Sequence, residues 1–135
     1  VRRAVEVALS EIERTMGDVY GSSAGHLEFQ YTARASYALN KALGAPIGKS
    51  FGMTCASPAA IGLVIADAAA KSAVIDPVGY ASPSQGTSFS NEVIFTVSGD
   101  SGAVRQAVIA AREVGLQLLS TLDPVEIKST TTPYI

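Results

Sequence analysis

The chain has 135 residues, of which 16% are charged and 47% are apolar, and its formal net charge is −2. This length supports one buried core but hardly two, so one complete domain is expected. A charged fraction below the roughly 25% of soluble domains suggests surfaces that contact other subunits, and the absence of a Lys/Arg cluster removes the electrostatic basis for binding nucleic acid.

The first predicted helix is repeated near the end of the chain. Val1-Arg2-x-Ala4-Val5 recurs as Val104-Arg105-x-Ala107-Val108, at an offset of 103 residues. A repeat about one domain long predicts tandem domains, in which residues 1–20 form the last helix of a preceding domain and residues 21–25 form a flexible linker. The alternative is two unrelated Ala/Val helices. The apolar stripes that superpose are Val1, Val5, Ala8, Ile12, Met16 and Val19 on Val104, Val108, Ala111, Gly115, Leu119 and Leu122.

The domain proper is expected to begin at His26. Apolar and polar residues alternate over 26–34, which predicts a half-buried strand. Residues 36–43 follow as a short helix, which Gly44 and Pro46 end. Phe51, Met53 and Cys55 alternate as a second strand.

A second helix is predicted to run to about Ser72, with Ser57 as its cap and Pro58 as its first residue. Its expected buried stripe is Ile61, Val64, Ile65 and Ala68. The most apolar window runs from Phe51 to Ala70, but it is interrupted by Ser57-Pro58 and contains the charged residue Asp67. No membrane-spanning helix is therefore expected. Residues 74–81 form a third strand, in which Pro77 indicates an edge or a bulge.

An uncharged loop, 82–88, leads to a fourth strand at Val93, Phe95 and Val97. Asp100 or Ser101 is expected to cap a long helix that runs to about Leu122. The predicted fold class is α+β, with a mainly antiparallel four-stranded sheet and helices packed on it. Residues 26–122 would form the domain and 123–135 an extended tail, with Asp123-Pro124 ending the helix.

Gly44-x-x-x-Gly48-Lys49-Ser50 superficially suggests a phosphate-binding loop. That loop needs four residues between its glycines and must open a helix, whereas here there are three and a strand follows. The segment is therefore interpreted as a turn with a solvated lysine.

His26 is the only histidine and Cys55 the only cysteine, so an internal disulfide is excluded and a metal site would need mostly carboxylates. A Cys/His dyad is conceivable, but Cys55 lies between apolar residues and is interpreted as a small core side chain. No pattern combines a nucleophile, a base and an oxyanion donor. We therefore expect no catalysis, cofactor or metal.

Two blocks of residues follow one another between Ala66 and Val108: Ala66-Asp67-x-x-x-Lys71-x-Ala73-Val74-x-x-x-Val78-Gly79-Tyr80 and Val97-x-Gly99-Asp100-x-x-Ala103-Val104-x-x-Ala107-Val108. In this order they closely resemble the signature of bacterial microcompartment shell domains. The resemblance implies a circularly permuted domain, since a strand at Leu27 to Arg34 precedes the strand with which ordinary members begin. Among these proteins, the sequence is most similar to the tandem-domain, trimeric shell proteins of propanediol- and ethanol-utilisation compartments. This similarity extends through the tail from Lys128 to Pro133.

This resemblance implies a structural shell protein of the bacterial cytoplasm, which forms trimers shaped like hexamers and assembles with other shell proteins. Lys71 matches the lysine at tile edges, and Arg34 is a candidate for the basic edge segment. The loop implied to line a pore or an interface around one, for small polar metabolites, contains Ser82, Ser84, Gln85, Gly86, Thr87 and Ser88.

Two rival functions come from other classes. The first is a ferredoxin-like regulatory domain that binds a small molecule, because such sandwiches often sense ligands at their interfaces. The second is a noncatalytic subunit of a larger enzyme.

Overall fold

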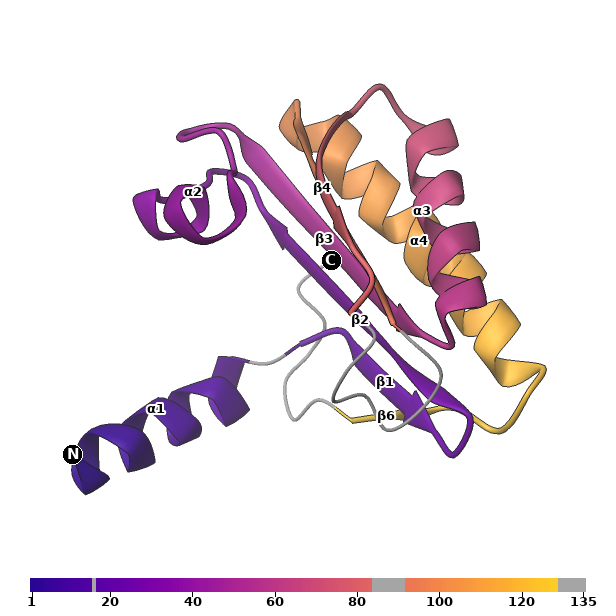
Figure 1. Ribbon diagram of the computed structural model, residues 1–135, viewed down its shortest axis with the longest axis horizontal. Coiled ribbons are helices and arrows are strands. Elements are labelled where there is room, and N and C mark those ends of the chain that lie inside the picture. Colours follow the sequence, from indigo (N-terminus) through magenta and orange to yellow (C-terminus); the bar gives the residue numbers. More distant parts are fainter. Residues whose placement is uncertain (16, 84–91, 129–135) are drawn as a thin grey trace.

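A computed structural model describes residues 1–15, 17–83 and 92–128, and Figure 1 shows how their helices and strands are arranged. The predicted order of strand, helix, strand, helix, strand, strand and helix is confirmed between Gly25 and Ser120. The elements are α1 Arg2–Thr15, β1 Val19–Ser22, β2 Gly25–Thr32, α2 Tyr37–Leu43, β3 Ser50–Ser57, α3 Ala59–Ser72, β4 Asp76–Ala81, β5 Val93–Gly99, α4 Ser101–Ser120 and β6 Glu126–Ile127.

One sheet of six strands organises the described part of the chain, in the order β4-β5-β3-β2-β1-β6. Every pairing is antiparallel, which confirms the predicted α+β class with a single antiparallel sheet. The four predicted strands are β2 to β5, and the short strands β1 and β6 extend the sheet beyond them. As Pro77 indicated, β4 is an edge strand, with a bulge between Pro77 and Gly79.

The two faces of the sheet are covered differently (Figure 1). Helices α3 and α4 pack on one face, where Leu27 and Phe29 of β2 are at most 1% exposed and Val104 and Val108 of α4 are fully buried. Burying each such side chain contributes about 1.5–3 kcal/mol. On the other face, α2 shelters Phe51, and no helix among the residues that the structure describes covers the far end of that face.

Glycines allow the helices to approach the sheet closely. A Cβ added to Gly52 of β3 would lie 2.7 Å from Cγ2 of Val108 in α4. A Cβ added to Gly62 of α3 would lie 2.4 Å from Cβ of Val93 in β5. Both distances are shorter than real carbon contacts, so any side chain at these positions would push the layers apart.

A buried ion pair attaches β1 to the helical layer. Arg112 of α4 donates from Nη1 to both carboxylate oxygens of Asp18 at 3.1 Å, and the Tyr20 hydroxyl donates to Oδ1 at 2.9 Å. The side chain of Asp18 is 1% exposed, so its charge requires these partners. Burial, followed by the adjacent Asp18 carboxylate, raises the pKa of Tyr20. The bonded group thus holds the start of β1 against α4.

The region between the first helix and β2 differs from the sequence-based expectation. Helix α1 ends at Thr15 rather than near residue 20, and Val19 belongs to β1. Residues 21–25 are not a flexible linker, because Gly21 pairs with His26 and Ser22 with Gly25 in the β1–β2 hairpin. The chain enters β1 through Asp18, whose φ of 53° is incompatible with helix continuation. The conformation of this segment is determined by strand pairing, which the helical spacing of its apolar residues does not reveal.

The start and buried face of α3 also differ from expectation. Its cap is Pro58, which follows a cis peptide bond from Ser57, and the helix begins at Ala59. Val64 is 47% exposed and Ala68 is only partly buried. Because nearly the whole circumference of α3 is apolar, its sequence does not determine which face meets the sheet. The buried residues are Ile61, Gly62, Ile65 and Ala69.

The long helix agrees more closely with its prediction. Asp100 occupies the N-cap position of α4, although its side chain makes no capping hydrogen bond. The predicted stripe from Val104 to Leu119 is buried, whereas Leu122 lies beyond the helix end and is 56% exposed. None of the helices in residues 1–15, 17–83 and 92–128 is both long enough and apolar enough to span a membrane.

Replacing Gly62 with Ala is expected to destabilise the domain by about 1–3 kcal/mol, because the new methyl group overlaps Val93. Gly102→Ala is the matched control, since nothing lies within 4 Å of its Cβ position and a helical alanine is favoured by up to about 1 kcal/mol. Denaturant unfolding of both variants measures the difference. Equal stability would show that α3 does not approach β5 this closely.

Candidate functional site

Lys71 and Arg34, the two predicted edge residues, lie at the same end of the sheet. Arg34 follows β2, and Lys71 lies in the last turn of α3, where its Nζ is 2.5 Å from Oδ2 of Asp67. Between these segments is an open cleft of about 400 Å³, whose lining includes Ala33 and Val74. Both basic side chains are exposed, so both are accessible to a neighbouring molecule.

The predicted pore loop is described only at its first residues. Ser82 donates from Oγ to the backbone oxygen of Glu92 at 3.0 Å, which links the two sides of the loop at its base. Ser84, Gln85, Gly86, Thr87 and Ser88 lie outside the described residues. Their assignment to a passage stays a prediction.

The segment that suggests a phosphate loop is a turn, as predicted. Gly44 ends α2 with a φ of 70°, and Gly48 has a φ of 80°. Strand β3, not a helix, begins at Ser50. The helix N-terminus on which a phosphate loop depends is therefore absent from this turn.

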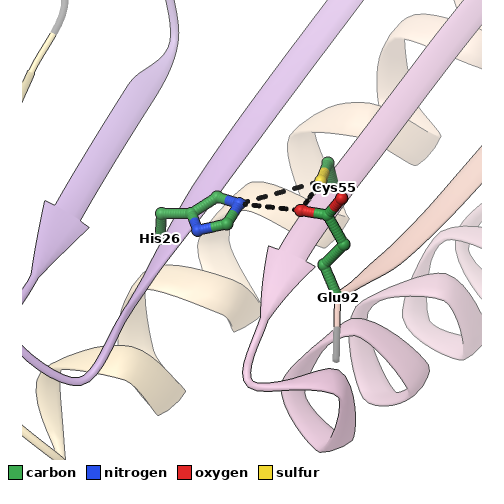
Figure 2. A group of neighbouring side chains, drawn as sticks. All are labelled: His26, Cys55 and Glu92. Atoms are coloured by element: carbon green, nitrogen blue, oxygen red, sulfur yellow. Dashed lines mark hydrogen bonds and ion pairs between the residues drawn. The ribbon is translucent and has the colours of Figure 1, made fainter. Parts of the chain in front are cut away.

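A polar cluster lies at the opposite end of the sheet, on the same face as α2 but away from that helix. Figure 2 shows that the side chains of His26, Cys55 and Glu92 converge from β2, β3 and the residue preceding β5. Nε2 of His26 is 3.9 Å from Sγ of Cys55 and 3.4 Å from Oε2 of Glu92. The Cys55 thiol lies 3.7 Å from the same Glu92 oxygen.

Strand register explains why these residues meet. Cys55 pairs with Glu28 of β2 on one side and with Ile94 of β5 on the other. Side chains two residues away in a neighbouring strand share the same face, so His26 and Glu92 are the diagonal neighbours of Cys55. Glu28 joins the cluster through Oε1, which is 3.9 Å from Nε2 of His26.

The electrostatics of the cluster disfavour a thiolate. Burial, followed by the negative charges of Glu28 and Glu92, raises the pKa of Cys55 to about 12. At neutral pH the thiol therefore stays protonated and donates toward Glu92. Catalytic cysteines need a lowered pKa, so this arrangement does not activate a nucleophile, although the dyad considered from the sequence is brought together.

The burial predicted for Cys55 is confirmed, since the residue is 4% exposed. Its surroundings were not predicted, and sequence reasoning missed both Glu28 and Glu92. The available signal was that His26 and Glu28 alternate with the core residues of one strand and Cys55 with those of another. The pairing between the strands, which the sequence does not give, was needed to predict that these side chains form one cluster.

Comparison with known proteins gives the family. A BMC domain family model matches residues 50–129. The bacterial microcompartment shell protein PduB of Salmonella typhimurium is 62% identical over 122 residues, which are 90% of this chain and 45% of that protein. PduB of Limosilactobacillus reuteri is 58% identical over 119 residues, 88% of this chain and 50% of that protein.

A solved structure agrees with this assignment. The crystal structure of a trimeric bacterial microcompartment shell protein PduB superposes with a TM-score of 0.83 at 54% identity, covering 99% of this chain and 59% of that chain. EtuB from Clostridium kluyveri superposes with the same TM-score at 47% identity, covering 99% of this chain and 58% of that one.

The chain therefore belongs to the BMC domain family and has its fold, which confirms the resemblance found in the sequence. It spans about half the length of the curated relatives it matches. The family match begins at Ser50, the first residue of β3, although β2 is paired along β3 within the same sheet. A sheet strand that precedes the matched region is the arrangement expected of a permuted domain.

Proposed function

We propose that this chain is one domain, with the last helix of a preceding domain, of a tandem-domain, trimeric shell protein, which builds the shell of a microcompartment in the bacterial cytoplasm and has a structural rather than a catalytic role. The observation that carries the proposal is the 62% identity to a PduB shell protein over 90% of the chain. The superposition on a trimeric PduB structure also supports it.

The exposed surface of α1 supports the tandem arrangement. In α4 the repeated apolar stripe is buried against the sheet. The corresponding Val5 and Ile12 of α1 are 52% and 49% exposed, and residues 1–14 are exposed throughout. Exposed apolar side chains in a helical stripe require a covering surface. We assign α1 to a preceding domain. The present domain comprises residues 26–122 together with β1 and β6, because β1 pairs with both β2 and β6, so the predicted tail joins the sheet at Glu126 and Ile127.

Expression of the complete open reading frame, followed by size-exclusion chromatography with light scattering and by electron microscopy, tests the function. Trimers of a two-domain chain that form hexagonal tiles are expected. Discrete dimers whose melting temperature shifts with a small ligand would instead support a regulatory domain and overturn the shell proposal.

Lys71→Ala is expected to leave the domain's stability within about 0.5 kcal/mol, because exposed helical ion pairs contribute little. Tile assembly should nevertheless weaken at equal concentration and salt, since the same edge contact is repeated around every trimer. Lys41→Ala, which removes the same charge from α2 on the other face of the sheet, is the control. Undiminished assembly of the Lys71 variant, measured by sedimentation and microscopy, would remove Lys71 from the edge. Arg34 is the second edge candidate.

The passage of small polar metabolites is assigned to the loop from Ser82 to Ser88. Its hydroxyl and amide groups can replace water around an uncharged solute without the slow release that a charge would cause. Replacing Gln85 and Thr87 with Phe is expected to reduce polyol flux through assembled shells several-fold while assembly persists. Flux equal to that of the parent shells, with intact trimers, would place the passage elsewhere.

A further inference from the structure

We propose that His26, Cys55 and Glu92 form a binding site for a divalent transition-metal ion of the zinc class. The ligand atoms belong to one residue of β2, one of β3 and the residue that precedes β5, and they point toward one another (Figure 2). This inference is independent of the proposed shell function, which requires no metal.

The separations of the ligand atoms fit one ion. The three distances are 3.9 Å between nitrogen and sulfur, 3.7 Å between sulfur and oxygen, and 3.4 Å between nitrogen and oxygen. A point equidistant from all three atoms lies about 2.1 Å from each, and bonds from zinc to nitrogen, oxygen and sulfur are about 2.0–2.3 Å. The side chains would therefore need to shift by only a few tenths of an ångström.

The chemistry of the donor set selects the class of metal. A thiolate, an imidazole and a carboxylate suit zinc or cobalt, whereas magnesium and calcium prefer oxygen ligands alone. The fourth ligand would be water or Glu28, whose Oε1 is 3.9 Å from Nε2 of His26. The side chains of His26 and Glu92 are 29% and 22% exposed, so an ion can enter from solvent.

Two features of the site favour a bound cation. His26 and Cys55 belong to paired strands, and Glu92 immediately precedes a third strand that pairs with β3. Their backbone is therefore already ordered, and little conformational freedom is lost when an ion binds. The carboxylates of Glu28 and Glu92 place negative charge around a thiol that is itself 4% exposed. A dication would reverse this local repulsion and stabilise the thiolate that coordinates it, with release of one proton.

Cobalt(II) is the probe for the test, because it binds zinc sites and reports its ligands by absorption. The protein must carry no histidine tag, since His26 is the only histidine of the chain. One cobalt ion per chain is expected, with a thiolate-to-cobalt charge-transfer band and the strong visible absorption of tetrahedral coordination. Zinc should displace the cobalt and raise the melting temperature.

Variants identify the ligands. Cys55→Ser should abolish the charge-transfer band, and His26→Ala and Glu92→Gln should each weaken cobalt binding at least tenfold. Glu113→Gln is the matched control, because Glu113 is an exposed glutamate on α4, in the opposite layer. Circular dichroism of each variant establishes that its fold is intact.

A measurement on the unaltered protein does not depend on any variant. Zinc should protect Cys55 from a thiol reagent, and a chelator should restore the labelling rate. The absence of a charge-transfer band at saturating cobalt would overturn the metal site, as would labelling unaffected by zinc or equal cobalt affinity of the Glu92→Gln and parent proteins. None of these outcomes bears on trimer formation, which is measured without metal.

Discussion

The register of the three central strands determines most of this structure. Pairing Leu27 with Ala56, and Ala56 with Val93, puts the apolar residues of β2, β3 and β5 under α3 and α4. The same register puts His26 and Cys55 on the other face. Because side chains alternate with a period of two, a slip of one residue in a single strand would expose its apolar side and bury its polar side. The core and the polar cluster are therefore two consequences of one alignment.

The helical layer reinforces this alignment through close contact. Glycines at 52 and 62 leave no room for side chains, so α3 and α4 rest directly on the strands. The Asp18–Arg112 pair extends this contact to the residue that precedes β1, and so fixes β1 against α4. Removing either partner would leave a buried charge without compensation, which usually costs about 3–5 kcal/mol. The hairpin is thus part of the domain, whereas α1 projects from it with its apolar stripe exposed (Figure 1).

The two candidate sites lie at opposite ends of the sheet. The end where β2 finishes carries the exposed basic residues Arg34 and Lys71 beside an open cleft. The other end carries the cluster of His26, Cys55 and Glu92. A low charge content over the whole chain is compatible with extensive contact between subunits, since unpaired charge at a buried interface is costly. Assembly and ion binding would accordingly use different surfaces of the same sheet.

The sequence by itself determined the strands β2 to β5, the helices α2 and α4, the antiparallel α+β class and the family. These depend on signals within one segment: alternation, helical spacing, a glycine after α2 and ordered motifs around Lys71 and Gly99. Only the tertiary structure decided that residues 21–25 form a hairpin and which face of α3 is buried. It also brought together the lone histidine and the lone cysteine, which are 29 positions apart in the chain. Each of these outcomes depends on contacts between segments that are distant in the chain. A local sequence pattern determines which side of a strand or helix is apolar, but it does not determine which other element packs against that side.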